Sequence, residues 1–325
     1  MKKLKEEIKE FAKKLGADLV GIASLDRYEG APKQMDPRYI NPEAKALIVL
    51  GLRIPRGALR GIEEGTYFLS YSSQAYGSIN AYYMPFILYH LTRFIEDNGY
   101  EATPIPNDYY DWPAIEYHNG KIKENWSRPV SPEKPMPDIF IHFRIAAYLA
   151  GLGEIGYSKL LLTPEFGPRQ RIGIVITEAS LEPDPIIEPG SICDRCMLCV
   201  KNCPGNAISS EEKVKVVLAG KEVEWGKLDC KACDIAFRGG RPVKPEEDDG
   251  SLPDYIDGQM YGYKIKPGDI TPFYKKPPNL YKTGQAICGG KGCIRACMIH
   301  LEKKGILKNK FEKPFRRAKE WYVEW

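Results

Sequence analysis

One run of cysteines constrains this chain more than any other feature. Residues 193–203 read C-x2-C-x2-C-x3-C, and Pro204 follows the last cysteine. Bacterial ferredoxins hold cubane iron–sulfur clusters with this spacing, which puts three thiolates on one cluster and the fourth on a second cluster. A structural zinc site instead prefers separated pairs of cysteines around one tetrahedral ion. The run therefore predicts two [4Fe-4S] clusters and a protein that handles electrons.

The remaining ligands must come from the C-terminal part of the chain, which has five further cysteines. We predict that the first cluster is bound by Cys193, Cys196, Cys199 and Cys297. We predict that the second is bound by Cys203, Cys288, Cys293 and one of Cys230 and Cys233. Spacing alone does not choose between those two. His300 follows Cys297 closely, but cysteine dominates cubane ligation, so we expect His300 to be a hydrogen-bond donor or a surface residue.

Composition limits the class of protein. The 325 residues suffice for one large domain and a smaller one. The 47 basic and 43 acidic residues nearly cancel, and no Lys/Arg tract is present, so we expect no nucleic-acid partner. The N-terminus is a charged amphipathic helix without secretory features, and no apolar stretch is long enough to span a bilayer. Nine cysteines without an export signal indicate a cytoplasmic protein with metal ligands.

Strands and helices alternate in the first 180 residues, which predicts an α/β layer. We expect strands at residues 17–24, 44–52, 100–106 and 171–178, and helices at residues 78–98 and 138–149. Pro85 must kink the helix at 78–98 or mark its true start. We divide the chain into an α/β domain (1–185), a two-cluster ferredoxin-like module (186–310) with a Pro/Gly-rich excursion (241–283), and a tail (311–325).

Residues 151–156 contain G-x-G-x-x-G, the pattern of dinucleotide-binding loops. That fingerprint needs a strand before the glycines and a helix after them. Here the preceding segment reads as a helix and the following segment leads to a strand, so we reject the dinucleotide interpretation. The glycines more plausibly let the backbone approach something flat or closely packed.

Residues 150–177, just before the cysteine run, resemble the shared signature of epoxyqueuosine reductases and reductive dehalogenases. The resemblance extends over residues 16–302. It implies a cobamide in an α/β domain related to the nitroreductase-like fold, followed by a ferredoxin-like module with two [4Fe-4S] clusters. A segment like residues 225–229 precedes a ligand in related sequences and lines up best with Cys233, which leaves Cys230 as the spare.

The chain also departs from these families. Epoxyqueuosine reductases have Lys where this chain has Tyr157, and they add a helical-repeat extension for tRNA, for which the stretch after Cys297 is too short. Respiratory dehalogenases carry a twin-arginine leader, which is absent. We therefore expect a soluble, shorter relative whose substrate is open.

The resemblance implies a reductase that cleaves a carbon–halogen, epoxide or similar bond. No histidine lies in D-x-H-x-x-G, so the cobamide would be base-off. A low-potential ferredoxin or flavodoxin would supply electrons, and the substrate would be a small molecule. The alternative is an electron-transfer protein, or a corrinoid activator or carrier, without its own substrate.

Proton donors and cobamide contacts are weaker predictions. For catalysis we nominate Tyr157, Asp138 and His142, although the first could serve packing, the second an N-cap and the third the core. For cobamide binding we nominate Gly151, Gly153, Gly156, Thr163, Arg169 and Arg171. The two arginines would contact the phosphate or propionamides, or would otherwise be a solvated strand edge.

Overall fold

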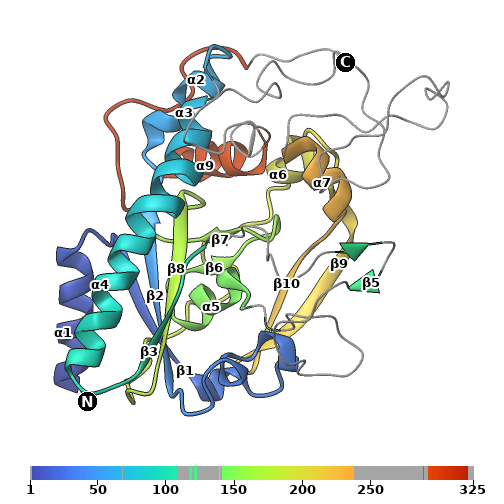
Figure 1. The fold of residues 1–325 in the computed structure, drawn as a ribbon. Helices are drawn as coiled ribbons and strands as arrows, with labels where there is room; N and C mark the ends of the chain where they lie inside the picture. The colour runs from blue at the N-terminus through green and yellow to red at the C-terminus, as the bar shows by residue number, and fades with distance from the viewer. Residues whose placement is uncertain are drawn as a thin grey trace.

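A four-stranded antiparallel sheet forms the centre of the N-terminal half (Figure 1). Its strands follow the order β1 (Leu19–Ser24), β2 (Ala46–Arg53), β8 (Gln170–Thr177) and β3 (Ala102–Ile105). The computed structural model describes residues 2–67, 69–107, 117–118, 121–122, 139, 141–237, 288 and 292–320. All four strands overlap the segments that the sequence predicts.

Helices cover both faces of the sheet. In β2, Ile48 and Leu50 join a core with α1 (Lys2–Lys14) and α4 (Met84–Asp97). Leu47 and Val49 point to the opposite face and pack in a second core with α5 (Phe143–Leu149). Since successive strand residues alternate between faces, a strand buried on both sides must be apolar throughout, as β2 is from Ala46 to Leu52. The mixed α/β fold is thus confirmed.

Two predicted helices differ from the observed ones. A π-helix (Ser73–Tyr83) and α4 together cover the expected helix at 78–98, and α3 (Leu69–Ser72) precedes them. Pro85 lies in the first turn of α4, where its missing N–H costs nothing, so it marks a start. The helix expected from residue 138 begins at Phe143, because the His142 side chain caps it: Nδ1 accepts the Ile145 N–H at 3.4 Å. Asp138 lies outside the described residues.

The C-terminal half adds a long hairpin that the sequence analysis missed. Strands β9 (Ile208–Leu218) and β10 (Lys221–Leu228) pair antiparallel, and Ala219 and Gly220 turn the chain with φ of 48° and 77°. Two positive φ values match the right-handed twist of a tight hairpin. Three helices accompany the hairpin: α6 (Leu198–Lys201), α7 (Cys230–Phe237) and α9 (Cys293–Lys303). The excursion at 241–283 lies outside the described residues.

The two halves share their apolar cores. Val223 and Trp225 of β10 are buried in the core around α5, and Ile294 and Met298 of α9 are buried in the core around α1 and α4. The division of the chain near residue 185 stays a prediction, but the segments on either side of it pack as neighbours. The remaining short elements are α2 (Arg60–Glu63), β4 (Tyr117–His118), β5 (Lys121–Ile122), β6 (Glu154–Ile155), β7 (Leu161–Leu162) and four 3-10 turns, η1 (Leu25–Tyr28), η2 (Lys33–Met35), η3 (Pro37–Tyr39) and η4 (Arg56–Leu59).

The glycine loop packs closely against the protein itself. A Cβ on Gly151, whose φ is +73°, would lie 2.2 Å from the Pro185 carbonyl oxygen. A Cβ on Gly153 would lie 2.1 Å from the Leu162 carbonyl oxygen. The expectation of a close approach is therefore confirmed, and its partner is the chain's own backbone. Among the described residues, no helix is both long enough and apolar enough to cross a membrane.

We predict that Gly153→Ala destabilises the fold by about 1–3 kcal/mol, because the added methyl group must displace backbone and not a flexible side chain. Gly57→Ala is the matched control, since a Cβ there meets nothing within 4 Å. Urea unfolding of the two variants measures the difference. Equal unfolding midpoints would show that the loop relaxes freely around the new methyl group.

Candidate functional site

The first predicted cysteine group converges in the structure. Cys193 and Cys196 lie in the loop before α6, Cys199 lies in α6, and Cys297 reaches them from α9. The four residues line a common cavity. Burial raises the pKa of the Cys297 thiol, and the three neighbouring thiols raise it further. Four sulfurs around one space fit a cubane cluster.

The second predicted group converges as well. Burial raises the pKa of the Cys293 thiol to about 12, and the neighbouring thiols of Cys203 and Cys233 contribute. The pKa of the Cys288 thiol is also raised by burial and by the neighbouring thiols of Cys293, Cys233 and Cys203. Cys230 stands apart and is exposed, and its thiol points to the Leu228 carbonyl at 3.8 Å. The arrangement fits a second cubane with Cys233 as the ligand, which stays a prediction.

These thiol pKa values bear on cluster assembly. Burial raises the pKa of Cys199 to about 11, so at neutral pH the buried thiols are protonated when no metal is bound. Iron binds the thiolate, and cluster binding therefore has to displace protons. Two residues of the loop, Arg195 and Met197, have left-handed φ values of 56° and 61°. Such strain in non-glycine residues is typical of loops shaped for a ligand.

A buried carboxylate connects the glycine loop to the cysteine run. Glu154 is 1% exposed and accepts backbone N–H groups from Gly190, Ile192 and Cys193, with 2.6 Å to Ile192. Burial raises the pKa of its carboxyl, and the N–H donors oppose that shift. Sequence analysis missed Glu154, although an acidic residue inside an otherwise apolar glycine loop was a usable signal. These hydrogen bonds fix the position of the backbone at the start of the cysteine run.

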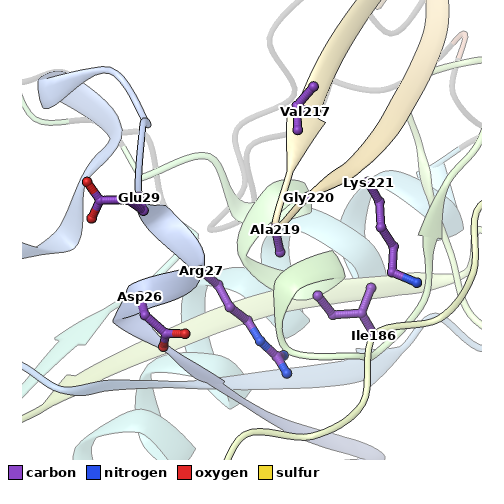
Figure 2. A pocket seen from close by; sticks show the side chains of 8 residues that line it. All are labelled: Asp26, Arg27, Glu29, Ile186, Val217, Ala219, Gly220 and Lys221. Carbon is purple, nitrogen blue, oxygen red and sulfur yellow. The ribbon is translucent and has the colours of Figure 1, made fainter.

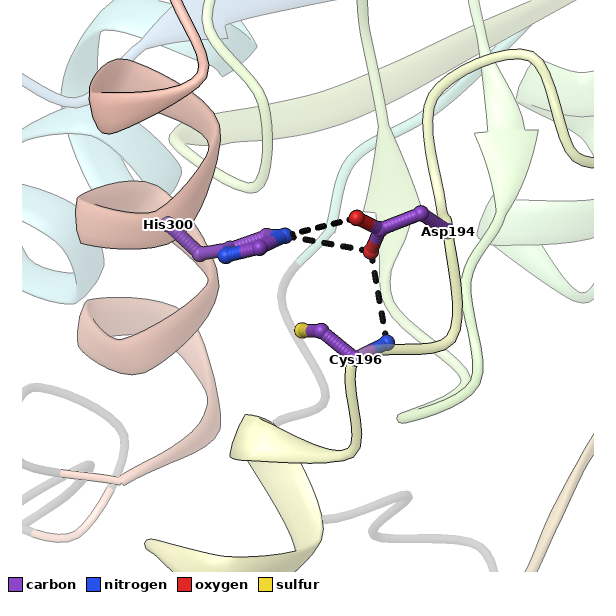
Figure 3. Close-up of side chains that lie close together, drawn as sticks. All are labelled: Asp194, Cys196 and His300. Atoms are coloured by element: carbon purple, nitrogen blue, oxygen red, sulfur yellow. Dashed lines mark hydrogen bonds and ion pairs between the residues drawn. The ribbon is translucent and has the colours of Figure 1, made fainter.

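His300 makes a hydrogen bond beside the first group (Figure 3). Its Nε2 lies 2.9 Å from a carboxylate oxygen of Asp194, and Lys304 binds the same carboxylate at 2.7 Å. Lys304 and His300 hold the pKa of the Asp194 carboxyl far below its usual range. Asp194, Cys196 and His300 place ligand atoms within 4.8 Å of one another. Cys196 also belongs to the first cysteine group. We therefore interpret His300 as a residue beside that group that is hydrogen-bonded to Asp194, and not as a cluster ligand.

The nominated catalytic residues make structural contacts. The Tyr157 hydroxyl donates to the Ser209 carbonyl of β9 at 3.0 Å, and its N–H points to the Cys193 sulfur at 3.4 Å. Acid catalysis by Tyr157 would require the first of these bonds to break. Burial lowers the pKa of His142 to about 4, with help from Lys159 and Arg144. His142 is therefore neutral at pH 7 and unsuited to donate a proton as imidazolium.

The two nominated arginines bind other parts of the chain. Arg169 is 1% exposed and donates to the Ile54 carbonyl at 2.7 Å and to the Asn309 side chain at 2.9 Å. Burial lowers its pKa to about 10. The Arg171 guanidinium lies 3.7 Å above the Tyr76 ring. Both arginines stabilise packing between distant segments, so the expectation of a solvated strand edge is wrong.

The other nominated cobamide residues also face protein. The Thr163 hydroxyl lies 3.2 Å from the Gln170 side-chain oxygen. Gly151 and Gly153 face carbonyl groups of the chain, and Gly156 faces a leucine side chain. Their role in cofactor binding stays a prediction.

Two cations beside the second group were missed by sequence analysis. The Arg144 guanidinium donates to the Lys159 carbonyl at 2.9 Å, and the Lys159 ammonium lies 5.4 Å from the centre of the Trp225 ring. Arg144 is close enough to Cys293 to lower its pKa, and Cys230 is near Lys159. Among the described residues no carboxylate pairs with either cation. Arg144 therefore offers positive charge to an anionic group next to the second cysteine group, and Lys159 adds positive charge near Cys230.

A cavity of about 580 Å³ lies elsewhere, between η1 and the tip of the β9–β10 hairpin (Figure 2). Its charged lining residues are Asp26, Arg27, Glu29 and Lys221. It contains no cysteine, and the signs of its charges alternate. We assign it no chemistry.

Comparison with known proteins shows which proteins this chain resembles. No family model matches the chain. Tetrachloroethene reductive dehalogenase of Desulfitobacterium hafniense is 45% identical over 73 residues, which cover 22% of this chain and 13% of that protein. Epoxyqueuosine reductase of Lactococcus garvieae is 23% identical over 271 residues, which cover 76% of this chain and 64% of that protein. The chain is thus similar in sequence to both reductive dehalogenases and epoxyqueuosine reductases.

The fold is also similar to that of a solved structure. A variant of a catabolic reductive dehalogenase superposes with a TM-score of 0.50 and 20% identity, over 94% of this chain and 38% of that one. In each of these comparisons the matched region is less than two thirds of the relative. The comparisons therefore do not establish the activity, the substrate or the partners of this chain.

We predict that Glu154→Gln destabilises the protein and weakens the first cysteine group. The amide presents a donor to backbone N–H groups, and each buried donor left unmatched costs about 1–3 kcal/mol. Glu165→Gln is the control, since that carboxylate is partly exposed and bound to Lys308. Iron content after reconstitution and urea unfolding report the two effects. If both variants behaved like the wild type, the carboxylate would not be holding the cysteine run.

We predict that His142 makes stability depend on pH. Its pKa is about 4 in the folded protein and about 6.5 in an unfolded chain. The unfolded state therefore binds more protons between these values, and stability falls as pH drops through this window. His142→Asn keeps an N-capping acceptor without titrating and should flatten the slope. An identical slope in the two proteins, measured by urea unfolding across that range, would contradict the assignment.

Proposed function

We propose that the protein is a reductase that takes electrons through two [4Fe-4S] clusters and uses them to cleave a carbon–halogen, epoxide or similar bond. The convergence of eight cysteines into two adjacent groups is the observation that carries the proposal. Cys196 of the first group is exposed, whereas all four cysteines of the second group are partly buried. The first group thus reaches the surface at Cys196.

The spacing of the ligands supports transfer between the groups. Helix α9 contributes Cys293 to one group and Cys297 to the other, one helical turn apart. The cysteine run does the same with Cys199 and Cys203. Each group is therefore tied to the other by two short covalent connections. This keeps the predicted clusters adjacent, as electron transfer between them requires.

The resemblance implies a cobamide as the final electron carrier, and a bound cobamide would supply a low-valent cobalt that reacts with the substrate. The residues nominated for it fit poorly, but Arg144 and Lys159 fit an anionic group such as a phosphate or a substrate carboxylate. Their positive charge would also favour the arrival of an electron at the second group. Tyr157 and Asp138 remain the proposed proton donors.

A nucleic acid is also a candidate substrate. One epoxyqueuosine reductase structure with a related fold contains a tRNA stem loop. This conflicts with the expectation, based on balanced charge, that nucleic acid is excluded. A tRNA stem loop therefore belongs among the substrates to be tested.

A second candidate is an electron-transfer protein, or a corrinoid activator or carrier. Arg169, Arg171 and Thr163 make contacts within the protein itself, which favours the electron-transfer protein because that candidate needs no cobamide site. The two candidates differ in whether a corrinoid binds and whether a product forms.

We predict that Cys293→Ser lowers the iron content from about eight to about four per chain, whereas Cys230→Ser keeps about eight. The first change removes a ligand of the second group, and the second changes the thiol that lies outside both groups. Iron analysis and electron paramagnetic resonance of the reduced proteins measure the outcome. Equal iron loss in both variants would exclude Cys230 as the spare.

The function is tested by anaerobic reconstitution with iron and sulfide, titration with cobalamin, and turnover with halogenated, epoxide and tRNA substrates. Corrinoid binding followed by product formation with any substrate supports the reductase. Cobalamin reduction without product from any substrate supports the activator or carrier. A reconstituted protein that holds about eight irons but binds no corrinoid would support the electron-transfer protein.

A further inference from the structure

The predicted cluster ligands differ sharply in exposure. Cys196 is exposed, Cys199 is buried, and the other six are partly buried. Cys196 lies in the loop before α6 and sits opposite the face of α9 that carries His300 (Figure 3). A partner protein that delivers electrons would come closest to a cluster by binding at the surface around Cys196.

Basic residues lie close to Cys196 in the sequence and at the end of the helix that packs on α6. Arg195 precedes Cys196, Lys201 ends α6, and Lys303 and Lys304 end α9, which packs on α6. All four side chains are in the exposed class. We call Arg195, Lys201, Lys303 and Lys304 the Cys196 face.

The nearby carboxylates are already neutralised. Asp194 binds both His300 and Lys304, and Glu224 binds both Arg195 and Lys213. Lys201 and Lys303 have no carboxylate partner in the described part of the chain. The Cys196 face thus keeps an excess of positive charge, although the whole chain has a net charge of only +4.

We propose that the Cys196 face is the docking surface for a small acidic redox protein that donates electrons. This rests on the proposed function, in that it requires the first cluster. Complementary charge steers association and raises the on-rate by about 10- to 1,000-fold. In the transfer, a bound flavin hydroquinone anion loses one electron to become the neutral semiquinone. The cluster held by Cys193, Cys196, Cys199 and Cys297 gains that electron, and no covalent bond forms or breaks.

The test uses the reconstituted full-length protein and the hydroquinone of an acidic flavodoxin. We expect Lys201→Glu combined with Lys303→Glu to lower the second-order rate of cluster reduction at least about tenfold at low salt. The difference should shrink as salt rises, because ions screen the charges within about 10 Å at 0.1 M. Binding of the oxidised flavodoxin, measured by calorimetry, should weaken in parallel.

The matched control is Lys3→Glu combined with Lys13→Glu. It makes the same change in net charge on exposed positions of α1, far from α6 and α9 (Figure 1). A neutral small reductant, photoreduced deazariboflavin, should reduce all three proteins at equal rates, and iron content should be unchanged.

Equal effects of the two double variants on reduction by flavodoxin would overturn the docking proposal and leave the proposed function intact. Failure of the wild type to accept electrons even from deazariboflavin would overturn both. A selective, salt-dependent loss in the Lys201/Lys303 variant supports the docking surface whether or not a substrate is known.

Discussion

The buried carboxylate of Glu154 is the contact on which the rest of the site depends. It belongs to the glycine loop of the sheet domain, yet its hydrogen-bond donors are the backbone N–H groups that lead into the cysteine run. A buried anion without donors is costly, so the entry to the run cannot move away without leaving that charge unsatisfied. The Tyr157 N–H adds a contact to the Cys193 sulfur. These contacts therefore fix the position of the cysteine run relative to the sheet domain.

The glycine loop explains how this contact is possible. Gly151 and Gly153 allow the linker at Pro185 and strand β7 to approach so closely that a methyl group would not fit. That approach brings Glu154 within reach of residues 190–193. The sequence pattern predicted a close approach, but the partner could not be predicted because the carbonyl groups involved come from segments with no pattern of their own.

Local signals predicted the sheet and the cysteine groups well. The four strands were expected from their apolar composition, and the cysteine spacing predicted two groups that the structure brings together. Prediction failed where a distant partner decides the outcome. Arg169 reaches Ile54 and Asn309, and α5 begins late because His142 caps it. The β9–β10 hairpin was missed, although both strands contain alternating charged and apolar residues, which is a usable strand signal.

Burial and charge act against each other at the second cysteine group. An added electron increases negative charge, which is less favourable in an enclosed site such as that around Cys293 than beside the exposed Cys196. Arg144 lowers the pKa of Cys293, which shows that its charge reaches this site and offsets part of the penalty. Lys159 lies beside it at the Trp225 ring. Since both cations lack carboxylate partners among the described residues, their field is not cancelled locally, and it favours electrons at the second group.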